Sequence, residues 1–177
     1  MLRVSLAADT VTQKKVRDRL LAVVRSSGGL EKWLFTDEVL IDDSPTSHSH
    51  PVLTIGTGGE SVKTDLGLLS VFVHEQIHWH LSLRPDQLRT ATNDLKGAYP
   101  KVRVGSKEGG ARDEESTYLH LLVCFLEFEG MSELIGKEKA AEFILGKPYY
   151  TWIYRTVVSD YSNLQSVVER HGLSIAD

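Results

Sequence analysis

The sequence has very little cysteine and no excess of basic charge, and each shortage excludes a class of protein. A single cysteine, Cys124, leaves no partner for a disulfide within the chain and suits a reducing compartment. The 20 Lys and Arg residues are scattered and are outnumbered by 24 Asp and Glu residues, so no basic face for nucleic acid is visible. We therefore expect a cytoplasmic protein that has no nucleic-acid partner.

Long apolar runs are also missing, which argues against a membrane protein. The longest strongly apolar run, residues 66–73, is much shorter than the ~20 residues that a helix needs to span a bilayer. The N-terminal stretch MLRVSLAADTVTQKK has only a broken apolar segment before charged residues begin, unlike a secretory signal or a transit peptide. We expect no membrane partner.

The order of the periodic segments predicts an α+β fold dominated by helix. Apolar residues recur at helical spacing in seven segments: residues 10–24, 62–83, 86–96, 113–128, 138–145, 149–161 and 163–171. Two short strands are expected between the first two helices, at residues 33–41 and 51–56. We expect one domain over residues 1–177. It would begin with a helix and a small sheet (1–60), continue with the two long helices (61–128) and end with a helical tail (129–177).

The first long apolar helix contains the sequence His74-Glu75-Gln76-Ile77-His78, which is an HExxH motif. Residues four apart lie on one face of a helix, so the two imidazoles can converge on one metal ion, and imidazole nitrogens suit Zn²⁺. Glu75 lies next to the first histidine, where it can exchange a proton with an attacking water. An ordinary helix with solvent-facing His and Glu remains the alternative, although burying these residues in an apolar helix without a purpose would be costly.

The motif resembles the active-site helix of the zincin metallopeptidases. The resemblance implies that His74 and His78 bind zinc and that Glu75 is the general base. It also implies a zincin-like domain, in which a small sheet precedes the active-site helix and one strand edge holds an extended peptide substrate. Residues 51–56 (PVLTIG) would supply that edge here. The residues after His78 lack the glycine and histidine of the metzincin extension, so that subgroup is excluded. The resemblance is to a small gluzincin-like protein, and the subgroup stays open.

The third zinc ligand is expected on the next long helix, where several residues compete for the role. His120 is our preferred ligand because a histidine in such an apolar helix needs a partner. Glu115 is the gluzincin-like alternative, although the acidic or small residue usual one turn later is replaced by Leu119. Glu114 and Glu127 remain open, and Glu127 could instead hold the ring of a ligand through a hydrogen bond.

Some further polar and aromatic residues receive weaker interpretations. We expect His80 at the surface or beside a ligand, and the loop histidines His48 and His50 without a function. Cys124 is expected to be a buried structural thiol, with metal binding as a lesser option. Tyr149, Tyr150 or Tyr154 could stabilise an oxyanion, but an aromatic stripe at helical spacing is more often core: KPYYTWIY, residues 147–154.

These observations predict a zinc-dependent hydrolase, and most simply a metallopeptidase that acts on a peptide or protein. Zn²⁺ held by His74, His78 and a third side chain would leave one position for the water that Glu75 activates. A zinc-binding or protein-interaction domain without catalysis is the alternative, and a toxin-like protein with one dedicated target is a third possibility. The sequence does not define the oligomeric state.

Overall fold

The computed structural model describes residues 2–175, which form seven α-helices and one three-stranded sheet. They group into two compact units, residues 1–80 and 81–177, and each unit is described here by itself. The expected helix-rich α+β fold, with a small sheet ahead of the HExxH helix, is confirmed, while the single domain over residues 1–177 stays a prediction. None of the helices formed by residues 2–175 is both long and apolar enough to cross a membrane.

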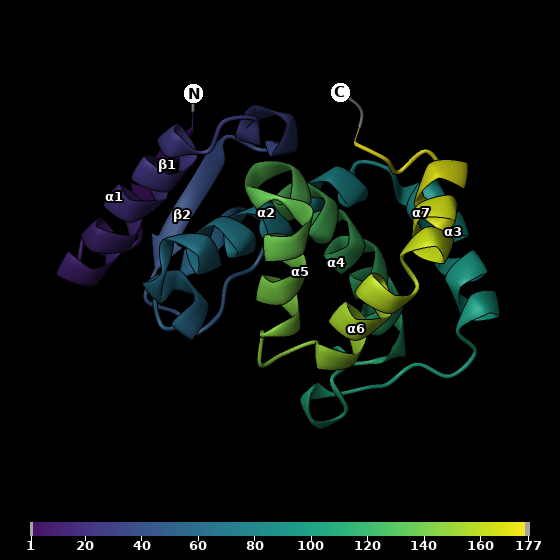
Figure 1. Ribbon diagram of the computed structural model, residues 1–177. Helices are drawn as coiled ribbons and strands as arrows, with labels where there is room; N and C mark the ends of the chain where they lie inside the picture. Colours follow the sequence, from purple (N-terminus) through teal and green to yellow (C-terminus); the bar gives the residue numbers. More distant parts are fainter. Residues whose placement is uncertain (1, 176–177) are drawn as a thin grey trace. The chain divides into compact units, whose positions relative to one another are not determined.

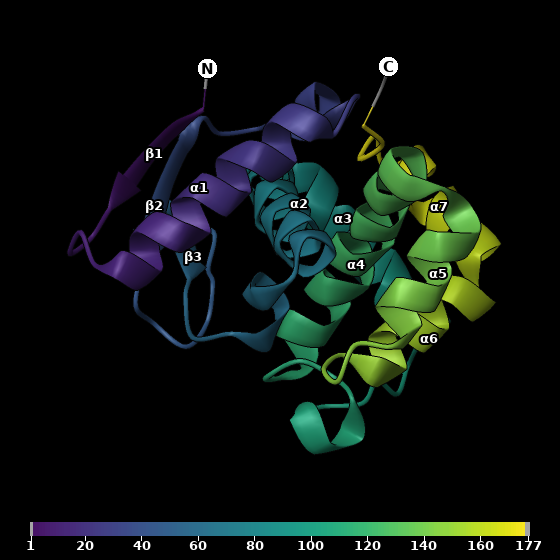
Figure 2. The same ribbon diagram turned by 60° about the vertical axis from the view of Figure 1, so that its left-hand side comes forward.

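The first unit is built on a parallel sheet in the order β1-β2-β3, with every strand ahead of helix α2. Helix α1 connects the first two strands and packs against both, as Figures 1 and 2 show. Thr10 caps α1 by accepting a hydrogen bond from the Gln13 amide at 3.2 Å. The elements of this unit are β1 (Arg3–Leu6), α1 (Val11–Ser26), β2 (Glu38–Asp42), β3 (Leu53–Gly56) and α2 (Asp65–Ser82).

Two expectations for the sheet were wrong. Strand β1 was not predicted, because its four residues are only half-buried or exposed and leave little periodic signal. The predicted strand at residues 33–41 begins five positions late, at Glu38, because Leu30–Trp33 form a 3-10 turn that buries Trp33. Both strand pairs are parallel: β1 pairs with β2 across more than thirty residues, as in Arg3 beside Glu38, and β2 pairs with β3 at a shorter separation, as in Val39 beside Leu53.

The outer edge of β3 is already paired with the chain's own loop. Thr54 donates its amide to the His48 carbonyl at 2.7 Å and accepts from the His48 amide at 3.0 Å. The next outward amide, that of Gly56, donates to Ser47 Oγ at 3.1 Å. The main-chain groups at Thr54 are therefore not available to an extended substrate, so the zincin-like use of residues 51–56 as a substrate edge does not fit this structure.

The second unit is a helical cluster around α4 (Glu114–Ile135). Helix α4 packs against each of the other four helices of the unit (Figure 2). Its side chains are buried on nearly every side. It runs past the predicted end at residue 128 and stops at Gly136, whose φ of 89° is a conformation that favours glycine. The surrounding helices are α3 (Pro85–Ala98), α5 (Lys137–Leu145), α6 (Thr151–Ser159) and α7 (Tyr161–Arg170).

Candidate metal centre

Helix α2 carries the whole HExxH motif in the first unit. The rings of His74 and His78 face each other edge to face, with centroids 5.1 Å apart, as expected for residues one turn apart on one helix face. Both histidines are half-buried and Glu75 is only 8% exposed. These side chains are therefore not the solvent-facing residues of an ordinary surface helix.

The start of α2 depends on a close approach of two backbone segments. The hydroxyl of Thr64 accepts a hydrogen bond from the Gly67 amide at 3.1 Å, and the Thr64 carbonyl accepts from the Leu68 amide at 2.9 Å. A Cβ at Gly67 would lie 2.0 Å from the carbonyl oxygen of Ser61, so only glycine fits at this position. The motif therefore lies on a helix whose first turn is fixed by the preceding loop.

Gln76, inside the motif, fixes α2 to the segment that leads into β2. Its Oε1 accepts hydrogen bonds from the amides of Phe35 at 2.7 Å and Thr36 at 2.9 Å. Its Nε2 donates to the carbonyl of Thr36 at 2.9 Å, and the side chain is fully buried. Sequence reasoning missed this role, although an amide inside an apolar helix requires hydrogen-bond partners and was a usable signal.

Trp79, next to the motif, fixes α2 to the loop before β3, and His80 packs on the same segment that Gln76 binds. The Trp79 indole donates to the Ser49 carbonyl at 2.8 Å, and the ring of His50 stacks on it with centroids 4.4 Å apart. His80 is 1% exposed and packs on the ring of Phe35 at 4.7 Å, so the expected surface position of His80 was wrong. His50 is thus a packing partner of the motif helix rather than a residue without a function.

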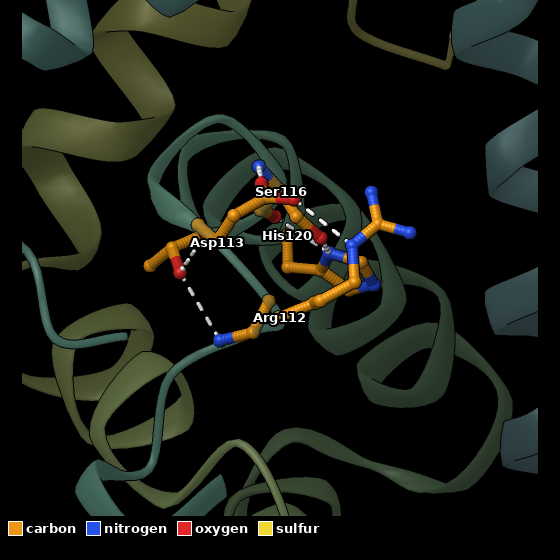
Figure 3. A network of polar contacts seen from close by, with 6 residues as sticks. Arg112, Asp113, Ser116 and His120 are labelled. Carbon is orange, nitrogen blue, oxygen red and sulfur yellow. Dashed lines mark hydrogen bonds and ion pairs between the residues drawn. The ribbon is translucent and has the colours of Figure 1, made fainter. Parts of the chain in front are cut away.

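His120 lies near the start of α4, in the second unit, within a polar network that Figure 3 shows. Asp113 caps the helix by accepting from the Ser116 amide at 2.7 Å, and it also pairs with Arg112 at 2.9 Å. The hydrogen bond from Ser116 and then the one from Arg112 hold the pKa of Asp113 below its ordinary value of 3.8. Asp113 therefore stays charged at the positive end of the helix.

The two ring nitrogens of His120 have different partners. Nδ1 lies 2.7 Å from the carbonyl oxygen of Ser116, and because a carbonyl only accepts, Nδ1 carries the proton. In the neutral ring Nε2 then presents a lone pair, which accepts a hydrogen bond from the Tyr150 hydroxyl at 3.1 Å. A histidine that ligates a metal through Nε2 has this tautomer, and so does a core histidine bonded to a carbonyl.

Glu127 does not fix the His120 ring in the way that the sequence suggested, because Ser116 and Tyr150 occupy its two nitrogens. Glu127 is fully buried and accepts from Lys147 Nζ and, at 2.8 Å, from the Tyr154 hydroxyl. Burial lowers the pKa of Lys147, but the Glu127 carboxylate together with Tyr149 and Cys124 raises it by more, so that the pKa lies above its ordinary value. Burial raises the pKa of Tyr154, so its hydroxyl keeps its proton and remains a hydrogen-bond donor.

The remaining ligand candidates occupy very different places in the second unit. Glu115, the alternative third ligand, has a side chain 72% exposed and forms an ion pair with Lys96 at 2.5 Å. Glu114 is also exposed in the first turn of α4. Cys124 is fully buried, as a structural thiol would be. Exposure and an existing cation partner both disfavour Glu115 against His120, although the identity of the third ligand stays a prediction.

Each unit contains imidazole groups, which are donors that suit zinc. His74 and His78 form a close imidazole pair, and His120 has the tautomer that leaves Nε2 as the donor atom. Comparison with protein-family models, with curated proteins and with solved structures found no match to this chain. Functional inference therefore depends on the chemistry of the residues themselves.

Proposed function

We propose that this protein is a zinc-dependent hydrolase, and specifically a metallopeptidase, with His74, His78 and His120 as metal ligands. The observation that carries the proposal is the close pair of half-buried imidazoles on α2, together with the nearly buried carboxylate of Glu75, which directly follows His74 in the same helix. Polar groups taken out of water are costly unless they are hydrogen-bonded, paired or bound to a metal ion, and two imidazoles one turn apart are a donor pair that suits zinc. The proposal requires the second unit to supply His120.

The zinc ion and the residues in and beside the motif would have separate roles in hydrolysis. A bound zinc ion would supply Lewis acidity, polarising a substrate carbonyl and lowering the pKa of water towards ~7. Glu75 would accept the proton of the attacking water and deliver it to the leaving group, as a general base and then a general acid. Gln76 and Trp79 would hold the helix against the sheet so that these side chains keep their positions.

Metal analysis of protein purified without a histidine tag tests the proposal first. We expect about one zinc per chain, lost in His74→Ala and His78→Ala and retained in His48→Ala, which removes an exposed loop histidine of the same unit. Glu75→Gln should keep the zinc and the fold but abolish hydrolysis of a mixture of quenched fluorescent peptides. Absence of zinc uptake by the wild-type protein would refute the metal site, and loss of zinc in Glu75→Gln would make Glu75 a ligand.

A zinc-binding domain without catalysis is the second candidate, and one observation favours it. The outer edge of β3 is paired with the loop at His48, so the expected main-chain docking of an extended peptide at Thr54 is blocked. Zinc binding that depends on His74 and His78, together with no hydrolysis of any peptide in the mixture by the wild-type protein, would support this second candidate over the metallopeptidase.

A further inference from the structure

We infer that Tyr150 is a latch that must leave His120 when this histidine binds a metal ion, so that metal binding releases a strained loop. The inference rests on the proposed function, because it takes His120 as a ligand. In the structure the Tyr150 hydroxyl donates to Nε2 of His120 at 3.1 Å, and the two rings pack with centroids 4.6 Å apart. Nε2 has a single lone pair, which can serve the hydroxyl or a metal but not both.

The position of Nδ1 makes this competition unavoidable. Nδ1 is held by the Ser116 carbonyl at 2.7 Å and also lies 3.4 Å from the Ser116 hydroxyl. Turning the ring to offer Nδ1 to a metal would break the bond to the carbonyl and leave a protonated nitrogen facing Tyr150. A metal is therefore expected at the same nitrogen that the tyrosine occupies.

Tyr150 belongs to a loop, residues 146–150, which we call the tyrosine loop and which α4 holds at both ends. Lys147, near its beginning, donates to the buried carboxylate of Glu127, and Tyr154, just after its end, donates to the other oxygen of the same carboxylate at 2.8 Å. Lys147 also donates to Tyr154 at 2.9 Å. Because Glu127 and His120 lie two turns apart on α4, one face of that helix holds the whole loop.

The backbone of Tyr150 is the strained part of the tyrosine loop. Its φ of 53° is left-handed, which is uncommon for a bulky residue and persists only where surrounding contacts impose it. The bond to His120 is one of these contacts. When the hydroxyl is released, the first turn of α6 can relax while Lys147 and Tyr154 keep the loop attached to α4, which gives the segment two arrangements.

Fluorine NMR of the full chain labelled with 3-fluorotyrosine tests the latch directly. The chain has six tyrosines, and the resonance missing from Tyr150→Phe identifies Tyr150. Adding zinc to the wild-type protein should shift this resonance in proportion to the zinc bound. In His120→Ala the resonance should occupy the shifted position without zinc and should not respond to zinc.

Zinc affinity, measured by competition with a chromogenic chelator, supplies an independent readout. Tyr150→Phe should bind zinc roughly two- to twelvefold more tightly, because the metal no longer displaces a neutral hydrogen bond. Tyr161→Phe is the matched control, since it removes a phenol that donates to Glu129 at 2.9 Å, and its zinc affinity should be unchanged.

The possible outcomes separate the latch from the proposed function. If zinc binds through His74 and His78 but the Tyr150 resonance does not move, the latch is wrong and the zinc site stands. Weaker zinc binding in Tyr150→Phe would also overturn the latch, because the tyrosine would then assist the metal. If the wild-type protein takes up no zinc, the proposed function and the latch are both wrong.

Discussion

Replacing Gln76 by Met should destabilise the first unit without removing any side chain proposed to bind metal. The substitution keeps the length of the side chain but removes three hydrogen bonds, two from the amides of Phe35 and Thr36 and one to the Thr36 carbonyl. Each polar group left unpaired in a buried site costs about 1–3 kcal/mol. Phe35 and Thr36 are only half-buried, so water can partly replace the lost partner. We therefore expect a total loss of about 2–4 kcal/mol.

Urea unfolding followed by tryptophan fluorescence measures this loss, because Trp33 and Trp79 both lie in the first unit. Gln87→Met is the matched control, since Gln87 is exposed on α3 and surface substitutions usually change stability by less than about 0.5 kcal/mol. A loss in Gln76→Met no larger than that of the control would refute the argument that Gln76 anchors α2. A fully stable variant with reduced zinc affinity would show instead that Gln76 positions the histidines without stabilising the fold.

Three further predictions concern the second unit. Lys147→Met should lower the free energy of unfolding, measured in urea, by about 3–5 kcal/mol, because the buried carboxylate of Glu127 loses its cation partner. Adding Glu127→Leu should recover most of this loss. Burial raises the pKa of Tyr161 from 10.0 to about 12, so its contribution to stability is complete below pH 10 and is lost as the pH rises through 12. Tyr161→Phe should flatten this alkaline fall in unfolding free energy, measured from pH 9 to 11.5, by on the order of 1 kcal/mol after solvent screening. In a chelator competition, His120→Ala should weaken zinc by more than the ~10–100-fold typical of an orienting partner, while Glu115→Ala should not.

The contrary result is specific in each case. A Lys147→Met variant as stable as the wild type would mean that the buried pair contributes little beyond what packing supplies. An unchanged alkaline slope in Tyr161→Phe would assign that slope to other tyrosines, such as Tyr99, whose pKa burial also raises. If Glu115→Ala strips the zinc while His120→Ala keeps it, the site is gluzincin-like and the preference for His120 is wrong.

The helices and the HExxH motif could be identified from the sequence because their signals are local. The spacing of the apolar residues indicated a helix over residues 10–24, and the structure confirms it as α1, with Thr10 as its cap. His74 and His78 are one turn apart on α2, so their proximity follows from helix geometry alone. The apolarity of the segment that forms α4 likewise indicated a buried helix, which the structure confirms.

Only the tertiary structure decided which partners the polar side chains take. Strand β1 exists because it pairs with β2 across a connection of more than thirty residues, and no local periodicity signals such a pairing. Gln76 meets Phe35 and Thr36, and His120 meets Tyr150, at sequence separations of 30 to 41 residues. The sequence shows that a buried polar group needs a hydrogen-bond partner. Which group becomes that partner is determined by how distant segments pack, because a hydrogen bond forms between any donor and acceptor that the fold brings within about 3 Å.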